Sequence, residues 1–106
     1  MSFRVEKATS FERPSKRLMR KYPSVKSDND KLISELEETS EMGVALGSGL
    51  YKVRMRTTSK RTGKSGGARV ITVVKVVDET VTLLTIYDKS EVDALSDAAL
   101  AAEVGE

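Results

Sequence analysis

The sequence contains no cysteine, no histidine and no tryptophan. Without cysteine, the chain has no disulfide framework, no thiolate nucleophile and no cysteine-ligated zinc site. Without histidine, it lacks the commonest metal ligand and the usual general base. Any chemistry must therefore use Lys, Arg, Tyr, Asp, Glu, Ser or Thr side chains, and we expect neither a cofactor nor a bound metal.

Long apolar runs are also absent from the sequence. No segment approaches the roughly 20 consecutive apolar residues that cross a bilayer, and the N-terminal residues lack the apolar core of a secretory signal. The 106 residues, of which 39% are hydrophobic, are enough for one modest core. We therefore expect a single domain spanning residues 1–106 of a cytoplasmic protein with no membrane contact.

Charge is strongly segregated along the chain, although the formal net charge is only +2. Residues 42–77 contain eight basic side chains and no acidic one, whereas residues 78–106 contain eight acidic side chains and one basic one. A local positive field of this kind attracts polyanions. The competing interpretation is a solvated basic surface that binds nothing specific.

Hydrophobic periodicity and breaker residues predict a small α+β domain. We expect an N-terminal helical hairpin, with Ser10 capping its first helix, packed on one face of a small antiparallel β-sheet, in the order β-α-α-β-β-β-α. The expected elements are a strand at 2–7, helices at about 11–22 and 26–39, strands at 50–57, 69–77 and 80–87, and a weak helix from about 96.

The strand expected at 50–57 alternates apolar and cationic side chains. Because successive strand residues point to opposite faces, one face of this strand is apolar and the other is cationic. The apolar face carries Tyr51, Val53 and Met55, and the cationic face carries Lys52, Arg54 and Arg56.

Further basic and aromatic residues stand at the ends of the neighbouring strands. Arg69 begins the next strand, and Tyr87 and Lys89 end the last one. If the three strands form a meander, these side chains converge with Lys52 and Arg54 on a surface that binds an RNA phosphate and stacks a base. The alternative is that the tyrosines edge the core and the cations only keep the sheet soluble.

Two other patterns carry no site. The Gly63-Lys64-Ser65 segment ends like a phosphate-binding loop, but Thr58 stands where the motif needs its first glycine. A strand rather than a helix is expected to follow it. The acidic clusters on the second expected helix have no histidine beside them, so we interpret them as a solvated helix face with a capping aspartate.

Several stretches resemble the RelE and HigB toxins, which are ribonucleases of bacterial type II toxin–antitoxin systems. These stretches are residues 49–54, 59–71 and 83–91, together with Lys21-Tyr22-Pro23-Ser24. The resemblance implies a toxin that cuts mRNA, often on the ribosome, by attack of a 2′-hydroxyl on the adjacent phosphodiester. It also implies a cognate antitoxin that covers the basic face.

The resemblance also implies roles for particular residues. Tyr51, Lys52 and Arg54 match the tyrosine-lysine-x-basic motif of the family, and Arg69 matches the arginine that opens the next strand. Lys52 is then the general base, Arg54 and Arg69 bind the phosphate, and Tyr87 or Lys89 protonates the leaving oxygen. The residues expected to bind the RNA backbone are Arg56, Lys60, Arg61 and Lys64.

The sequence departs from the family pattern at two places. The loop at 57–68 is longer than in the best-known members, and the segment after Lys89 is acidic where some relatives are basic. Two alternative functions therefore stay open: a ParE-like inhibitor of DNA gyrase, and a degenerate toxin that only binds its antitoxin.

Overall fold

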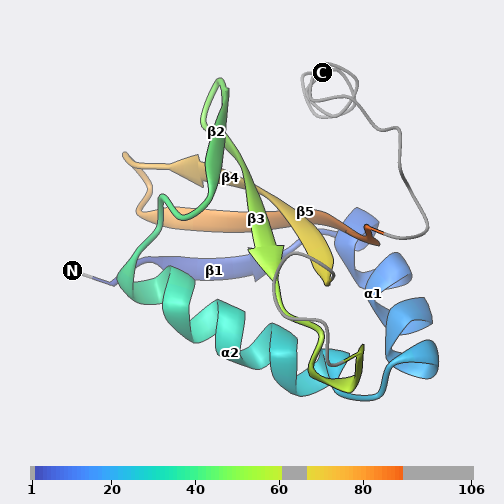
Figure 1. The fold of residues 1–106 in the computed structure, drawn as a ribbon. Helices are drawn as coiled ribbons and strands as arrows, with labels where there is room; N and C mark the ends of the chain where they lie inside the picture. The colour runs from blue at the N-terminus through green and yellow to red at the C-terminus, as the bar shows by residue number, and fades with distance from the viewer. Residues whose placement is uncertain (1, 61–66, 90–106) are drawn as a thin grey trace.

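The computed structural model describes residues 2–60 and 67–89, which Figure 1 draws in colour. These residues form two helices, one short 3₁₀ helix (η1) and five strands in a single sheet with the order β1-β5-β4-β3-β2. The expected α+β class and the helical hairpin on the sheet are confirmed. The elements are β1 (Arg4–Lys7), α1 (Thr9–Lys21), α2 (Val25–Glu38), β2 (Val44–Gly47), β3 (Leu50–Met55), η1 (Thr58–Lys60), β4 (Ala68–Lys75) and β5 (Thr80–Asp88).

Strands β2 to β5 pair antiparallel, as expected for a meander. The first strand differs, because β1 lies parallel to β5 at the edge of the sheet, with Val5 opposite Val81. Its sequence predicts a strand, but its partner lies more than 70 residues away, so no local pattern indicates the direction of pairing. This parallel pair makes the sheet mixed.

Strand β2 is an addition to the expected element order. No strand is expected between the second helix and residue 50, but Val44–Gly47 pairs with the start of β3 as a hairpin. The connecting residues Gly47, Ser48 and Gly49 all have positive φ, which glycine adopts readily. Gly47 and Gly49, with Ser48 between them, therefore form the turn of a short edge hairpin.

The first helix begins earlier than the sequence indicates. Its N-cap is Ala8 and its first residue is Thr9, so the expectation that Ser10 caps the helix is wrong. The Ser10 hydroxyl instead donates a hydrogen bond to the backbone carbonyl of Leu84. This bond ties α1 to β5 across the layer, a contact that depends on the tertiary fold rather than on the local sequence.

The main core lies between the helices and one face of the sheet, and Figure 1 shows both helices on that side. The apolar face of β3 points into it, as the alternation predicts. Removing such side chains from water is the dominant stabilising contribution in a domain of this size. The buried contributors include Phe11, Leu18, Leu32, Leu36, Val53, Val70, Val81, Leu83 and Ile86.

The hairpin between β4 and β5 begins sooner than expected. Strand β4 ends at Lys75, and Val76 and Val77 lie exposed in the turn that precedes β5. Their β-branched side chains favour a strand locally, but no neighbouring strand pairs with them in the described fold. The weak helix expected from about residue 96 lies outside the described residues.

Two glycines allow the chain to pass close to β3. A Cβ atom at Gly43 would lie 2.3 Å from the carbonyl oxygen of Lys52, and one at Gly67 would lie 2.3 Å from the carbonyl oxygen of Met55. Gly43 also has a φ of +92°. Both contacts fix the position of the strand that carries Lys52 and Arg54.

Candidate nucleic-acid interface

The face of the sheet opposite the helices, called the open face below, places residues of three strands in one row. Arg54 on β3 lies directly opposite Arg69 on β4, and Arg69 lies directly opposite Tyr87 on β5. Neighbouring strands are about 4.8 Å apart, so this cross-strand row of Arg54, Arg69 and Tyr87 spans about 10 Å. The structure therefore brings together three residues that lie far apart in the sequence.

Lys52 lies on the same face as the cross-strand row. It is two residues before Arg54 on β3, about 7 Å along the strand, and its register partner on β4 is Ile71. Its side chain is half-buried. Lys52 thus sits beside one end of the row, within reach of a group bound to Arg54.

Lys89 lies at the same end of the sheet, just beyond β5. Its backbone N–H donates a hydrogen bond of 3.2 Å to the carbonyl oxygen of Gly67, two residues before Arg69. Its side chain is exposed. The second candidate proton donor is therefore near the start of β4, whereas Tyr87 is part of the row itself.

Arg69 is the most buried cation of the row, with only 6% of its surface exposed. One of its guanidinium nitrogens donates a hydrogen bond of 3.2 Å to the backbone carbonyl of Ala68. Burial lowers the pKa of the Arg69 guanidinium, the positive charge of Arg54 lowers it further, and Tyr87 acts in the opposite direction. An arginine nevertheless stays protonated in any ordinary assay, so the row holds two adjacent positive charges.

An apolar strip lies beside the row on the open face. Leu50 on β3 and Ile71 on β4 are 4% and 1% exposed, although α1 and α2 both lie on the other side of the sheet. Half-buried apolar side chains pack around them, including Tyr87 itself. The open face therefore combines a cationic end with an apolar middle.

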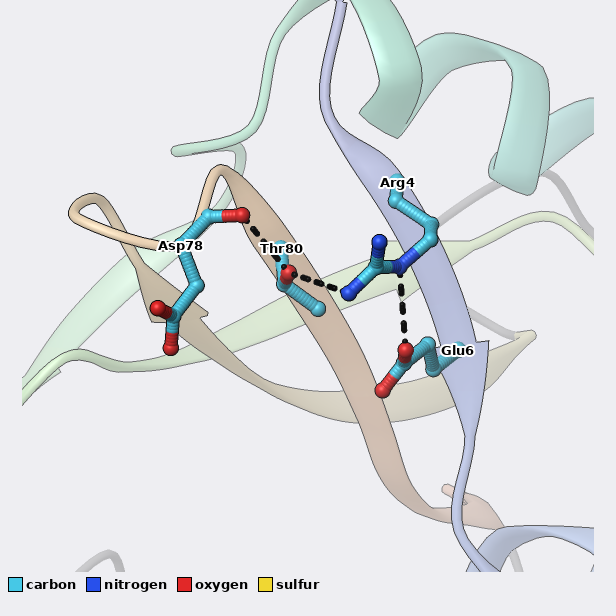
Figure 2. Close-up of polar contacts among 4 residues, drawn as sticks. All are labelled: Arg4, Glu6, Asp78 and Thr80. Carbon is cyan, nitrogen blue, oxygen red and sulfur yellow. Dashed lines mark hydrogen bonds and ion pairs between the residues drawn. The ribbon is translucent and has the colours of Figure 1, made fainter.

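The opposite end of the open face also carries an arginine, but one with a different environment (Figure 2). Arg4 on β1 forms an ion pair of 3.0 Å with Glu6 and donates to the Thr80 hydroxyl at 3.4 Å. The Thr80 hydroxyl donates to the backbone carbonyl of Asp78 at 3.0 Å. This end presents charge that is already neutralised within the protein.

The chain that follows β3 is held to the start of α2 by a cluster of hydrogen bonds. The Asp28 carboxylate accepts bonds from the Thr58 backbone N–H at 3.0 Å, the Thr58 hydroxyl at 2.6 Å and the Ser24 hydroxyl at 2.8 Å. Ser24 and Ser59 are also linked by two bonds, in which each backbone N–H donates to the other residue's hydroxyl. The sequence gives no sign of the contact with Thr58, because Thr58 lies 30 residues after Asp28.

The residues expected to bind the RNA backbone are only partly described. Arg56 is exposed and follows β3 on the side of the row, and Lys60 is the last residue of η1. Arg61 and Lys64 lie outside the described residues. The basic segment therefore begins next to the row, at a point that the Asp28 contacts hold in place.

Residues 2–60 and 67–89 contain no group of three or more His, Cys, Asp or Glu side chains placed to hold a metal ion. Within the same ranges, no helix is long and apolar enough to cross a membrane.

Sequence comparisons find no relative, because no family model and no curated protein match the chain. Structural comparison finds solved structures with a similar fold. A mutant of the Escherichia coli toxin RelE in the free state matches with a TM-score of 0.68 and 12% identity over 98% of both chains. The isolated E. coli RelE toxin matches with a TM-score of 0.63 and 13% identity over 99% of this chain and 100% of that one.

A third solved structure is a complex. The RelBE2 toxin–antitoxin complex from Mycobacterium tuberculosis matches with a TM-score of 0.59 and 15% identity, over 83% of this chain and 92% of that chain. All three likenesses fall below the identity at which an activity is shared as a matter of course, so they establish the backbone arrangement. The chain has a RelE-like fold.

Proposed function

We propose that the protein is the toxin of a type II toxin–antitoxin system and a metal-independent endoribonuclease that cleaves mRNA, on the ribosome, in the cytoplasm. The observation that carries the proposal is the cross-strand row with Lys52 beside it. Two arginines placed directly opposite each other repel and destabilise a sheet. A bound phosphate relieves that repulsion, since arginine guanidinium groups match phosphate oxygens. The likeness to RelE toxins supports the same reading.

The proposed reaction uses only side chains of the open face. Lys52 accepts the proton of a ribose 2′-hydroxyl, whose oxygen then attacks the adjacent phosphorus. The bond from phosphorus to the 5′-oxygen of the next nucleotide breaks, and Tyr87 or Lys89 donates a proton to that oxygen. The products are a 2′,3′-cyclic phosphate, which water can open to a 3′-phosphate, and a 5′-hydroxyl.

Arg54 and Arg69 have separate parts in this scheme. The charge on the phosphate oxygens grows as the transition state forms, and guanidinium groups already in place stabilise it without reorganisation. The partial burial of Arg69 removes water from this interaction and so strengthens it. Arg56, with Lys60, Arg61 and Lys64 further along the chain, binds the RNA backbone on either side.

The open face also suits the proposed antitoxin. Its apolar strip offers the half-buried Leu46, Val73 and Leu84, which pack on Leu50 and Ile71, and its cationic end offers the exposed Arg54. A segment with apolar side chains followed by acidic ones covers both at once and blocks RNA. One of the structural neighbours was solved as a toxin–antitoxin complex.

The direct test is inducible expression of the wild type, Lys52→Ala and Arg54→Ala in bacteria, with mapping of transcript ends. We expect the wild type to arrest growth and to leave 5′-hydroxyl ends in mRNA. Both variants should lose cutting, while Arg13→Ala, on the exposed side of α1, should keep it. Purified protein should cut ribosome-bound mRNA in the presence of a chelator.

Two results would overturn this assignment. Full toxicity of both Lys52→Ala and Arg54→Ala would remove these residues from catalysis. Inhibition of DNA gyrase supercoiling by the purified protein, with no RNA cleavage, would instead show a ParE-like inhibitor.

A further inference from the structure

A cleft of about 170 Å³ lies beside the cross-strand row, at the outer edge of β3. Strand β2 pairs only with residues 50–52 of β3, so the later part of β3 has α2 as its neighbour on this side, as Figure 1 shows. Arg54 lines this cleft as well as belonging to the row. The cleft and the proposed phosphate site therefore share one side chain.

The cleft has an apolar floor and a charged rim. Leu32 of α2 and Met55 of β3 are 3% and 4% exposed and form the floor. The rim carries Lys31 and Glu35 from α2, Arg54 from β3, and Arg56, which follows β3. A flat apolar group with polar edges fits such a site, and arginine guanidinium planes stack on aromatic rings.

Only one of the two carboxylates at this cleft is available to a ligand. Asp28 already accepts three hydrogen bonds from Ser24 and Thr58. Glu35 is exposed, and its side chain makes no hydrogen bond or ion pair within residues 2–60 and 67–89. Glu35 therefore presents two acceptor oxygens at the rim.

The position of Glu35 does not serve the stability of its helix. It lies in the last turn of α2, where the helix dipole disfavours negative charge and where α2 has no basic residue. Lys31 stands one turn before it, and a lysine that precedes a glutamate by four residues is the less favourable order for an ion pair. The rim of the cleft thus presents the Lys31 ammonium, a hydrogen-bond donor, beside the two acceptor oxygens of the Glu35 carboxylate. The two side chains form no ion pair with each other within the described residues.

This pattern matches the edge of one nucleobase. Guanine carries an acceptor, O6, next to two adjacent donors, N1–H and N2–H, and a carboxylate accepts from both donors at once. Adenine, cytosine and uracil do not offer two adjacent ring-edge donors. At about 170 Å³ the cleft is smaller than the roughly 300–1,000 Å³ of typical small-molecule pockets, which suits a single base rather than a larger ligand.

We propose that this cleft binds a guanine of the RNA next to the phosphate on the cross-strand row, and that Glu35 determines this specificity. The inference rests on the proposed ribonuclease function and extends it to a sequence preference. Leu32 and Met55 contact the face of the base, Lys31 donates to O6, and Arg54 joins the base site to the phosphate site.

The first test compares cleavage of four RNAs that differ only in having G, A, C or U at one position next to the cut. We expect the wild type to cut the G-containing RNA at least about tenfold faster, as one good base contact provides. Glu35→Gln should lose this preference, whereas Glu38→Gln, on the same turn but not lining the cleft, should keep it. Equal cutting of all four RNAs by the wild type, or an unchanged preference in Glu35→Gln, would overturn the proposal.

The second test needs no cleavage and so separates this proposal from the ribonuclease itself. Backbone amide signals are followed by NMR while GMP, AMP, CMP or UMP is added to the full-length protein. GMP alone should shift the signals of Leu32 and Met55, and Glu35→Gln should abolish the shift. A protein that binds GMP in this way but cuts no RNA would keep the base site and refute the ribonuclease, whereas RNA cleavage without any GMP-specific shift would refute the base site.

Discussion

The open face of the sheet carries arginines at both of its ends, but the charged groups around the arginines differ between the two ends. At one end Arg4 is paired with Glu6 and Thr80. At the other end, about 20 Å away along β4, Arg54 faces Arg69. The first arrangement neutralises charge within the protein, while the second places two like charges directly opposite each other. We infer that the second end is shaped for a ligand and the first for the fold.

The largest expected effect is on cleavage. Arg69→Ala removes one of the two guanidinium groups that we propose stabilise the phosphate in the transition state, so we expect the rate to fall about one hundred to one thousandfold, or about 2.7–4 kcal/mol. Arg4→Ala, on the same face but at the neutralised end, should leave the rate unchanged. The measurement is cleavage of ribosome-bound mRNA per folded molecule, and equal losses in both variants would erase the difference between the two ends.

A smaller effect is expected where the backbone holds the row in place. In Gly67→Ala the new methyl carbon would lie 2.3 Å from the Met55 carbonyl oxygen, so β3 and β4 must shift apart at their shared end. We expect the free energy of unfolding to fall by about 1–3 kcal/mol, which is usual for overpacking. Chemical denaturation measures this change, and a variant as stable as the wild type would show that the close approach is not needed.

Stability should change in opposite directions at the two ends when one arginine is neutralised. Arg54→Gln removes a like-charge contact, so we expect the free energy of unfolding to rise by about 0.2–1 kcal/mol while cleavage falls. Arg4→Gln removes an exposed ion pair and should lower stability by about 0–1 kcal/mol. Thermal unfolding of both variants at low salt checks the signs, and a loss of stability in Arg54→Gln would contradict the repulsion.

The smallest effect concerns the dependence of RNA binding on salt. Each phosphate contact made to a single strand adds about 0.7 to the slope of log affinity against log salt concentration. Arg56 is exposed beside the row, so Arg56→Gln should reduce the slope by about that amount. An unchanged slope would place the RNA path elsewhere.

Much of the candidate site could be predicted from the sequence because it depends on local alternation. The period-two pattern of β3 puts Lys52 and Arg54 on the face opposite Val53, and the structure confirms it. The meander then brings Arg69 and Tyr87 into register with Arg54. Charge segregation and strand alternation are local properties of the sequence, so both can be predicted without the tertiary structure.

The features that could not be predicted depend on contacts between distant residues. The parallel pairing of β1, the hydrogen bonds from Thr58 to Asp28, and the cleft that contains Glu35 all join segments that are far apart in the chain. An additional residue in β5 near Leu84 also shifts the register between β4 and β5, which no composition signal indicates. The sequence therefore predicts the cationic residues of the open face but not the cleft between the edge of β3 and α2.

The central claim is that the open face binds an RNA phosphate at the cross-strand row. The most direct measurement is an NMR titration of the full-length protein with an oligoribonucleotide whose 2′-hydroxyls are methylated, so that it binds but cannot be cut. We predict chemical-shift changes at Arg54, Arg69 and Tyr87, and none around Arg4. Changes confined to the outer surfaces of α1 and α2, or no changes at all, would contradict the account.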